Sequence, residues 1–500
     1  MAELGSLRRL GTGAFIYGAG GFLSRFISLL ILPLFTAYLT PTDYGITGLL
    51  GMVSMVVVSV FSLGLGTSLG ICYFQESTAE KRGAAIWTAF GILGLSAAAL
   101  AVLGTQTAEA ISQLALGTTQ YPHLVTLTLL TACLSIAAQP LMLCLQFEER
   151  ARTYVSLTML TTLFTLGISI WMVVFLRGGV EGVLWAGLLG QALNLIVFLA
   201  AAIRIARFRV DPRIAMELLR LGLPMVPSFA FLFLLSQANR YVLQWFAGLS
   251  PVGIYSIGLN FGMVMNIAVS GFQTAWLPYF LSFSDKRDEA RILFGRIMTY
   301  YVLGLGGASL LFFIGAKPLV MLMTAPAFHQ AYQVVGLAAT AQVLAGVFSV
   351  LLPAVYFAKE VASVTIVQGI ASLLAIILSI PLIAFFGLFG AALSLPLGYA
   401  IMAGMQYGWN VRRRDAYLQV VYDWARIGRF ALVYVAFGAL TLVPRSLSLP
   451  VELLLSMASG GLLLVCCERM LTKGEKQALL GMLRPWIPAN WPRTGPRTSE

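Results

Sequence analysis

Apolar stretches of roughly 20 residues or more recur along the whole chain, and each is long enough to cross about 30 Å of hydrocarbon as a helix. Apolar residues make up 59% of the sequence and charged residues only 10%, whereas about a quarter of the residues are charged in a typical soluble domain. The chain is therefore expected to be an all-α polytopic membrane protein with about 14 transmembrane helices. The predicted spans are 13–37, 45–71, 84–104, 122–145, 153–176, 182–203, 222–247, 252–281, 293–315, 331–357, 362–385, 388–409, 427–444 and 449–468.

The distribution of Lys and Arg predicts which ends of these spans face the cytoplasm. Of the 32 cationic residues, 27 fall before the first span, in every second turn or in the tail, and only Arg177, Lys317 and Arg445 fall in the alternate turns. Because cationic turns stay on the cytoplasmic side, both termini are predicted to be cytoplasmic, with the first span retained as a helix. The net charge of +12 reports this topology, and no basic groove with interleaved aromatic residues indicates nucleic-acid binding.

The sequence also repeats itself after about 210 residues. Three motifs recur in register: Leu-Thr-Pro at 39–41 with Leu-Ser-Pro at 249–251, Gly-Leu at 48–49 with Gly-Leu at 258–259, and GVEG at 179–182 with GLFG at 387–390. The first two motifs share an offset of 210 residues and the third has an offset of 208. Two duplicated halves in a membrane transporter commonly hold the substrate site between them.

Each copy of the repeat contains six predicted spans, and because six is even both copies begin on the same side of the membrane. The sequence therefore predicts two parallel six-helix bundles that form two lobes around a central cavity, related by an axis along the membrane normal. The expected units are an N-lobe at 1–210, a C-lobe at 211–425, an additional helix pair at 426–470 and a cytoplasmic or interfacial tail at 471–500. The basic connection from Arg204 to Arg220 is the predicted linker between the lobes.

Each half carries one arginine inside an otherwise apolar span. Arg25 lies near the middle of the first span, and Arg240 lies toward the outer end of the seventh, next to Asn239 and one helical turn after Gln237. A cation at the centre of a membrane helix costs about 3 kcal/mol, so such residues usually face a bundle interior or water and take part in function. Two alternatives remain: Arg240 could extend to the membrane surface, and Arg25 could be a structural partner of backbone carbonyls.

The eighth predicted span carries a polar stripe. Asn266, Ser270 and Gln273 follow one another at four- and three-residue steps, and Trp276 comes next on the same helix face. Neutral amides, hydroxyls and an aromatic ring suit a sugar, because they bind hydroxyl groups without the desolvation penalty of charges. Such a stripe is equally often a contact that packs one membrane helix against another.

Residues typical of other functions are missing from the spans. We expect no buried carboxylate for proton exchange, since the candidate acids lie at span ends: Asp43, Glu148, Glu149, Glu181 and Glu360. His123 and His329 lie near outer ends of spans, and the five cysteines show no metal-type spacing. Without a cluster of His, Asp or Glu, the chain is not expected to be an enzyme or to need a metal or cofactor.

Three stretches carry a resemblance to a known family: FLSRFISLLILPLFTAYLTPTDYGITGLL at 22–50, LRGGVEGVLWAGLLGQ at 176–191 and LLSQANRYVLQWFAGLSPVGIYSIG at 234–258. They resemble the polysaccharide-transport flippases of the multidrug/oligosaccharidyl-lipid/polysaccharide exporter superfamily over about residues 5–425. The most specific signature is the Asn239-Arg240 pair followed by Ser250-Pro251 and Tyr255.

This resemblance implies transport of undecaprenyl-diphosphate-linked oligosaccharides from the inner to the outer leaflet of the bacterial cytoplasmic membrane. The implied path is a cavity between two six-helix lobes, lined by Arg25 and Arg240. The implied partners are the lipid-linked oligosaccharide, membrane lipids and polysaccharide assembly enzymes, and neither the glycan nor the pathway carries over.

The sequence thus leads to a hypothesis of a flippase for polysaccharide biosynthesis that works by alternating access. Arg25 and Arg240, with Asn239 and Gln237, would hold the diphosphate, while Asn266 and Gln273 would contact the glycan. Two other readings stay open at this point: a cation-coupled exporter of drugs or other small molecules with the same architecture, and a non-transporting membrane scaffold for glycan assembly.

Overall fold

The computed structural model describes residues 23, 27, 30–76, 78–283, 286–358, 360, 362–413, 418–442 and 449–470. All regular secondary structure within these ranges is helical. A helix satisfies its backbone hydrogen bonds within its own segment, which a membrane interior without water demands. The prediction of an all-α polytopic membrane protein is confirmed.

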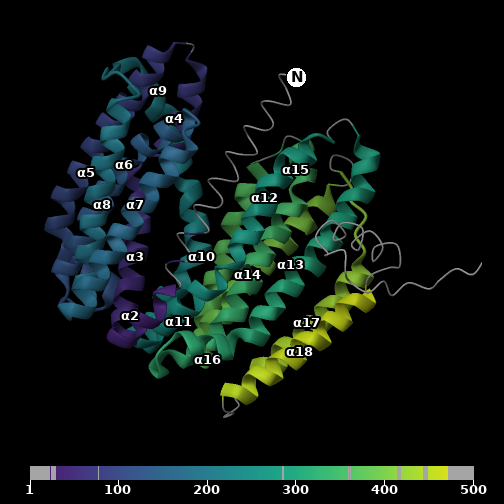
Figure 1. The fold of residues 1–500 in the computed structure, drawn as a ribbon. Helices are drawn as coiled ribbons and strands as arrows, with labels where there is room; N and C mark the ends of the chain where they lie inside the picture. Colours follow the sequence, from purple (N-terminus) through teal and green to yellow (C-terminus); the bar gives the residue numbers. More distant parts are fainter. Residues whose placement is uncertain are drawn as a thin grey trace, which may run out of the picture.

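The first half of the described chain forms one helical body, which we call the first body (Figure 1). Within it, α5 packs against α6, and α8 packs against both α6 and α7. Its elements are α3 (Pro41–Phe61), α4 (Leu65–Gln75), α5 (Ala79–Leu116), α6 (Pro122–Phe147), α7 (Ala151–Ile170), the π-helix η1 (Trp171–Phe175) and α8 (Gly179–Ile203).

The next part of the chain forms the second body, in which α16 packs against α10 and α14, and α13 packs against α14 (Figure 1). Its elements are α10 (Val226–Ala247), α11 (Leu249–Gly262), α12 (Met265–Leu281), α13 (Arg287–Met323), η3 (Pro326–Ala331), α14 (Tyr332–Leu351), α15 (Pro353–Phe357) and α16 (Ala362–Arg412).

The connection between the bodies contains the short helix α9 (Pro212–Gly222) and the 3-10 turn η2 (Leu223–Met225). Asp211 caps α9 by accepting a hydrogen bond from the Arg213 backbone N–H. Although it follows the basic stretch that leads to the second body, α9 packs on α4 and α5 of the first body. The linker is therefore attached to the first body along most of its length.

Among the described residues, nine helices are long and apolar enough to cross a membrane, or ten if the bent pair α11 and α12 counts as one span. Each predicted span from 45–71 onward coincides with a helix or a broken helix. The total of about 14 stays a prediction, because most of the first predicted span, including Arg25, lies outside the described residues. The tail after Met470 also lies outside the described residues.

The predicted repeat is visible in the backbone. Gly179 and Gly387, which the sequence aligns, both adopt left-handed φ angles, of 53° and 54°. At the second of these turns the Leu382 carbonyl oxygen lies 1.9 Å from the position of a Cβ atom on Gly390. In a straight helix, residues eight positions apart would be about 12 Å apart, so the chain reverses here and α16 contains two predicted spans.

The last two described helices, α17 (Trp424–Leu442) and α18 (Leu449–Met470), form a pair that packs on α13. The Tyr434 hydroxyl lies 2.7 Å from the hydroxyls of both Ser309 and Thr340. On the other helix, the Ser456 hydroxyl donates a 2.8 Å hydrogen bond to the Ile314 carbonyl. These contacts attach the pair to the second body.

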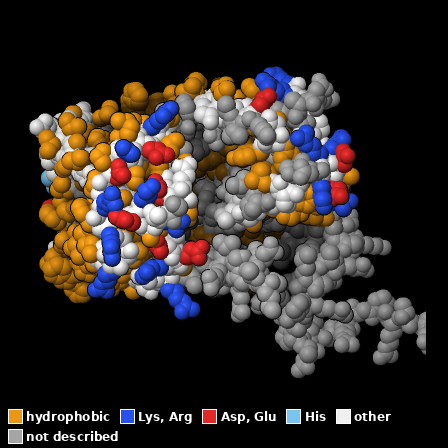
Figure 2. All heavy atoms as spheres, turned by 90° about the horizontal axis from the view of Figure 1, so that it is seen from above, with side chains coloured by type: hydrophobic (Ala, Val, Ile, Leu, Met, Phe, Trp, Pro, Cys, Tyr) orange, Lys and Arg blue, Asp and Glu red, His pale blue; other side chains and the backbone are white. Residues whose placement is uncertain are grey.

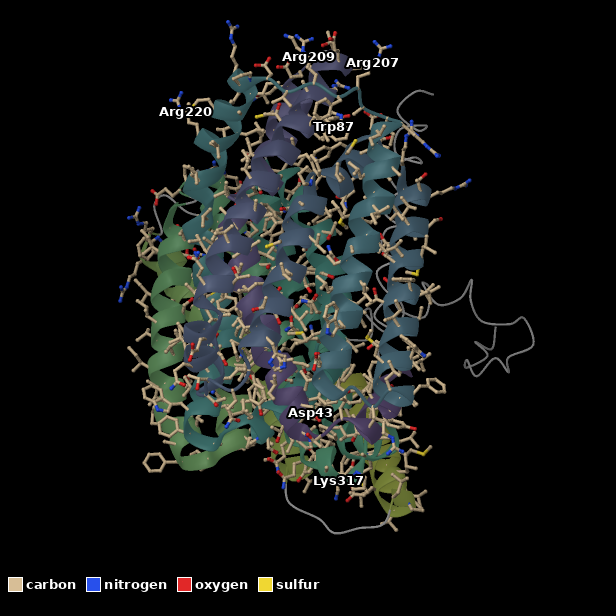
Figure 3. All side chains as sticks on the ribbon, turned by 90° about the vertical axis from the view of Figure 1, so that its left-hand side faces the viewer. Asp43, Trp87, Arg207, Arg209, Arg220 and Lys317 are labelled. Carbon is tan, nitrogen blue, oxygen red and sulfur yellow. The ribbon has the colours of Figure 1, made fainter. Side chains whose placement is uncertain are left out.

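A buried ion pair strengthens this attachment. Lys317 of α13 and Glu452 of α18 form a salt bridge in which the two side chains are only 19% and 7% exposed, and Figure 3 shows Lys317 at the end of the molecule opposite Arg207. The expectation that the spans hold no buried carboxylate is therefore wrong at Glu452. Lys317, assigned to an outer turn from the sequence, belongs to α13.

We predict that Glu452→Gln destabilises the protein by about 3 kcal/mol or more, because it removes the carboxylate that compensates a buried ammonium group. Thermal unfolding of the purified protein measures this. The double variant Lys317→Met/Glu452→Leu, which removes both charges, should recover most of the loss. Equal destabilisation by the single and the double variant would contradict the role of the ion pair.

Candidate functional site at the junction of the two bodies

A cleft separates the two bodies at one end of the molecule (Figure 2). The bodies diverge toward the end that carries α9 and α15 and converge at the opposite end, around α2 (Leu32–Tyr38) and α11 (Figure 1). Arg207, Arg209 and Arg220 lie at the open end, and Asp43 and Lys317 lie toward the closed end (Figure 3). The described structure is thus open on its basic side only.

The closed end depends on a contact between the starts of α3 and α11. A Cβ atom on Gly45 would lie 2.0 Å from the Leu249 carbonyl oxygen, and one on Gly253 would lie 1.8 Å from the Pro41 carbonyl oxygen. No side chain fits at either distance, so the two glycines let the helices touch through their backbones. Each helix contributes one glycine and one carbonyl, but the two glycines are not equivalent in the repeat: at the offset of 210 residues, Gly45 aligns with Tyr255 and Gly253 aligns with Asp43.

Local sequence explains why α3 begins where it does. The Thr40 side chain accepts a hydrogen bond from the Asp43 backbone N–H, and Asp43 accepts one from the Thr40 backbone N–H at 2.8 Å. This capping box, followed by Pro41 at the first helical position, fixes the start of the helix. The Leu-Thr-Pro motif therefore places the glycine contact.

Helix α2 is the described end of the first predicted span, and it also lies at this junction. Leu32 is buried in a cluster with Ile257 and Phe328 of the second body. The Thr36 hydroxyl accepts a hydrogen bond from the Ala325 backbone N–H at 3.2 Å. The span that carries Arg25 thus ends between the two bodies.

Arg240 projects from α10 into the junction. Its Nη1 donates a hydrogen bond to the Gly48 carbonyl oxygen of α3, at 3.3 Å. We call this contact the Arg240 bridge. The Arg240 bridge connects the two bodies. The sequence left open that the Arg240 side chain extends to the membrane surface, but its guanidinium ends at the Gly48 carbonyl instead.

Several polar atoms around the Arg240 bridge are buried and have no hydrogen-bond partner among the described residues. They are Arg240 Nε, Asn239 Nδ2, Gln237 Oε1, the Tyr255 hydroxyl and Ser256 Oγ. Asn239 is 3% exposed and Tyr255 is fully buried. Buried polar groups are almost always paired in folded proteins, and each unpaired group costs about 1–3 kcal/mol. Four of the five atoms can donate, so the group suits an anionic or otherwise acceptor-rich ligand.

The polar stripe on α12 packs against α14. Asn266 Nδ2 donates to Gln342 Oε1 at 2.8 Å and Gln273 Nε2 donates to Ser349 Oγ at 2.8 Å. The Trp276 indole N–H donates to the Ser349 carbonyl at 3.0 Å. Between Met265 and Ala275, the exposed residues of α12 are small or carry a hydroxyl: Ala268, Ser270, Gly271, Thr274 and Ala275. Nearer the end of the helix, Tyr279 and Leu281 are exposed as well.

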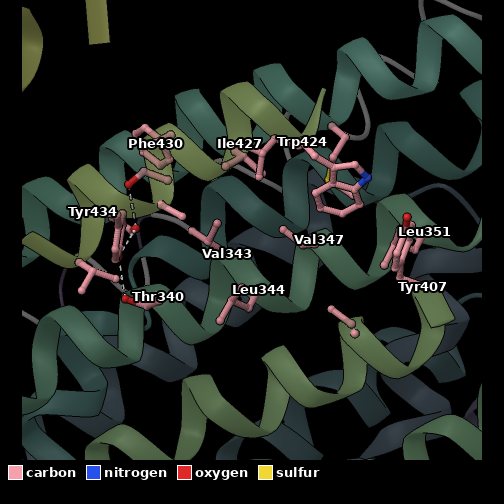
Figure 4. A pocket seen from close by; sticks show the side chains of 18 residues that line it. Thr340, Val343, Leu344, Val347, Leu351, Tyr407, Trp424, Ile427, Phe430 and Tyr434 are labelled. Atoms are coloured by element: carbon pink, nitrogen blue, oxygen red, sulfur yellow. Dashed lines mark hydrogen bonds between the residues drawn. The ribbon is translucent and has the colours of Figure 1, made fainter. Parts of the chain in front are cut away.

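A separate cavity of about 360 Å³ lies between α13, α14, α16 and α17 (Figure 4). Val343, Val347 and Trp424 are among its lining residues. The hydroxyl of Tyr434, which also borders it, is already bonded to Ser309 and Thr340. Its apolar wall suits hydrocarbon and offers nothing to a charged group.

The described residues contain no group of His, Cys, Asp and Glu able to hold a metal ion.

Tyr255, Ser256 and Gly48 were not predicted as site residues. A signal was present for two of them, because Gly48 is a marker of the repeat and Tyr255 closes the family signature. Ser256 carries no such signal. Its place beside Gly48, where a Cβ atom would lie 2.6 Å from Ser256 Oγ, depends on how the two bodies meet.

Residues 10–284 match the family described as polysaccharide biosynthesis protein. The chain belongs to this family. The match covers more than half of the sequence and includes α2, α3, α10 and α11, which build the junction. The resemblance drawn from the sequence motifs is confirmed. No curated protein sequence matches the chain.

Solved structures show the same fold. A lipid II flippase MurJ in an inward closed conformation has a TM-score of 0.70 and 14% sequence identity, covering 91% of this chain and 99% of its own. An inward-facing multidrug resistance transporter of the MATE family has a TM-score of 0.64 and 14% identity, covering 79% and 98%. A MATE transporter from Vibrio cholerae has a TM-score of 0.51 and 17% identity, covering 82% and 98%. Family and fold together support a multi-pass membrane protein of the flippase and transporter class.

We predict that Asn266→Leu lowers the stability of the second body by about 1 kcal/mol, because the half-buried Gln342 amide loses its partner. Thermal unfolding measures the loss. The double variant Asn266→Leu/Gln342→Leu should lose less, since neither amide is then left unpaired. An unchanged melting temperature in the single variant would rule out a packing role for Asn266.

Proposed function

We propose that this protein is a flippase that moves a polyprenyl-diphosphate-linked oligosaccharide from the inner to the outer leaflet of the cytoplasmic membrane. The observation that carries the proposal is Arg240, an arginine held between two helical bodies among unpaired hydrogen-bond donors, at the closed end of a cleft. A diphosphate is the part of such a substrate that these groups would bind. Family membership and the shared fold agree with a transport function.

Arginine suits this role for physical reasons. The guanidinium stays charged, and its planar set of donors matches phosphate oxygens in pairs. In a partly dry site, each charge-assisted hydrogen bond contributes about 1.5–3 kcal/mol. We assign Asn239 and Gln237 to the same group. We also propose that Arg25, which lies outside the described residues, is a second arginine that binds the diphosphate.

The two bodies would act as the lobes of an alternating-access transporter. We assign residues 1–210 to the N-lobe and 211–425 to the C-lobe, with 426–470 as a helix pair attached to the second. The open, basic end would face the cytoplasm, since cationic turns are retained there. The substrate would enter the cleft from the inner leaflet and keep its prenyl chain in lipid.

The glycan would contact α12. Ser270 and Thr274 are exposed on the part of α12 before Trp276, where the small and hydroxyl-bearing residues suit water and sugar better than lipid. Asn266 and Gln273 would support this contact from behind, by fixing α12 against α14 through their bonds to Gln342 and Ser349.

We predict that Arg25→Ala and Arg240→Ala each lower glycan export by about 10- to 100-fold, the factor expected for losing a charge-assisted contact of 1.5–3 kcal/mol. Surface display of the polysaccharide in cells, together with the amount of membrane-inserted protein, measures the effect. Arg220→Ala is the matched control, because Arg220 is exposed on α9. Full export by the double variant Arg25→Ala/Arg240→Ala would refute the assignment.

Transport also needs a driving force, and we infer that the membrane potential supplies it. Moving one negative charge outward from an inside-negative cell is downhill by roughly 2.3 kcal/mol per 100 mV. The buried carboxylate that the structure adds, Glu452, is paired with Lys317 between α13 and α18. Neither the membrane potential nor the Lys317–Glu452 ion pair requires proton exchange.

In liposomes, an imposed potential that is negative inside should accelerate outward flipping of the lipid-linked glycan. A pH gradient imposed without a potential should leave the rate unchanged. Fluorescent labelling of substrate that reaches the outer leaflet measures both arms. A rate that responds to the pH gradient and ignores the potential would replace this mechanism with proton exchange.

A further inference from the structure

We propose that the anion of the substrate and the Gly48 carbonyl compete for Arg240, so that anion binding breaks the Arg240 bridge and lets α3 separate from α11. The inference rests on the proposed function, because it takes the anion to be a prenyl diphosphate. It adds a step that binding alone does not contain, namely that the ligand opens the closed end of the cleft.

The Arg240 bridge is a weak contact that a better acceptor can replace. Its 3.3 Å length exceeds the usual 2.7–3.2 Å of an N–H···O bond. The acceptor is a neutral carbonyl, whereas hydrogen bonds to phosphate oxygens are shorter and about twice as strong. Arg240 Nε is buried and has no partner among the described residues, so the guanidinium keeps a donor that the closed state does not use and that an anion can occupy together with Nη1.

The surrounding donors favour the same exchange. Asn239 Nδ2, the Tyr255 hydroxyl and Ser256 Oγ are buried and unpaired in the described part of the chain. Asn239 belongs to α10, whereas Tyr255 and Ser256 belong to α11. An anion between these helices and α3 would satisfy groups that the closed state leaves unpaired. The ligand therefore stabilises a state other than the closed one, which is the condition for shifting an equilibrium.

The glycine contact makes the opening a two-state change. Gly45 and Gly253 touch carbonyl oxygens of the opposite helix, and backbone surfaces packed this closely cannot separate by a fraction of an ångström without losing contact. Gly48 lies one helical turn after Gly45, so the carbonyl that holds Arg240 moves with the glycine contact. Breaking the bridge would therefore act directly on the closure.

The exchange can be followed with a cysteine at Val252, which is fully buried in α11. The protein is purified in full length, with its five native cysteines replaced and Val252→Cys added, and is reconstituted into vesicles. The rate of labelling by a maleimide reports opening, and Thr42→Cys, exposed on α3, is the control for general reactivity. The ligand is farnesyl diphosphate, and farnesol is its uncharged counterpart.

Without ligand, Val252→Cys should react slowly, and farnesyl diphosphate should accelerate labelling on the order of 10-fold, the factor expected for one charge-assisted hydrogen bond. Farnesol should have no effect. Arg240→Gln should react quickly before any ligand is added and should not respond further. Arg240→Lys keeps the positive charge but loses the planar set of guanidinium donors, so its labelling rate should be intermediate. If Arg240→Gln does not fold, the labelling rate of Arg240→Lys tests the proposal in its place.

Gly253→Ala separates opening from anion binding. It should label quickly, because its methyl group displaces the Pro41 carbonyl, yet it should still bind farnesyl diphosphate through Arg240. Slow labelling of both Arg240 variants would overturn the exchange. Binding of farnesyl diphosphate to the wild type without faster labelling would overturn it too, but would leave the anion site standing. Absence of binding would overturn the proposed function as well.

Discussion

The structure depends on a contact that only glycine permits. At the closed end of the cleft, α3 and α11 meet with their backbones in contact, because Gly45 and Gly253 have no side chain to hold them apart. Everything of functional interest is arranged around this point: α2 lies beside it, α10 sends Arg240 into it, and the cleft opens away from it. A larger residue at either glycine would move the helix that carries Gly48 and would thereby move the partner of the guanidinium.

The internal repeat explains why such a contact can exist. Two copies of one bundle, inserted in the same direction, bring corresponding helices together at their common axis, and each helix then meets its own counterpart. The Leu-Thr-Pro and Leu-Ser-Pro motifs both lie at the start of a junction helix, whereas the glycines of the contact, Gly45 and Gly253, occupy positions that the repeat does not align. The aligned glycines Gly179 and Gly387 share a left-handed backbone conformation, so the copies agree at this turn.

Much of the fold could be predicted from the sequence, because a lipid bilayer restricts the secondary structures and residue types that can cross it. Span positions and the repeat follow from hydropathy and spacing, and the cost of a buried charge predicts that Arg240 points into the protein interior. Contacts between residues that are far apart in the sequence cannot be predicted in this way. Glu452 lies within the predicted span 449–468 and was not among the candidate acids, and only the fold brings it to Lys317, 135 residues away. Likewise, the stripe of Asn266 and Gln273 reveals one polar face of a helix, but not that Gln342 and Ser349, each 76 residues further on, occupy that face.

The α17–α18 pair shows which motions the fold permits. Its polar contacts, through Tyr434, Ser456 and Glu452, all go to α13 or α14 of the second body. Contacts of this kind, at several depths along the helices, make the pair move with that body. It therefore adds mass to one side of the cleft without resisting separation of α3 from α11. The resistance comes from the backbone contact, from the contacts of α2 with the second body and from the Arg240 bridge. A ligand that acts on Arg240 therefore acts on one of the interactions that hold the closed end together.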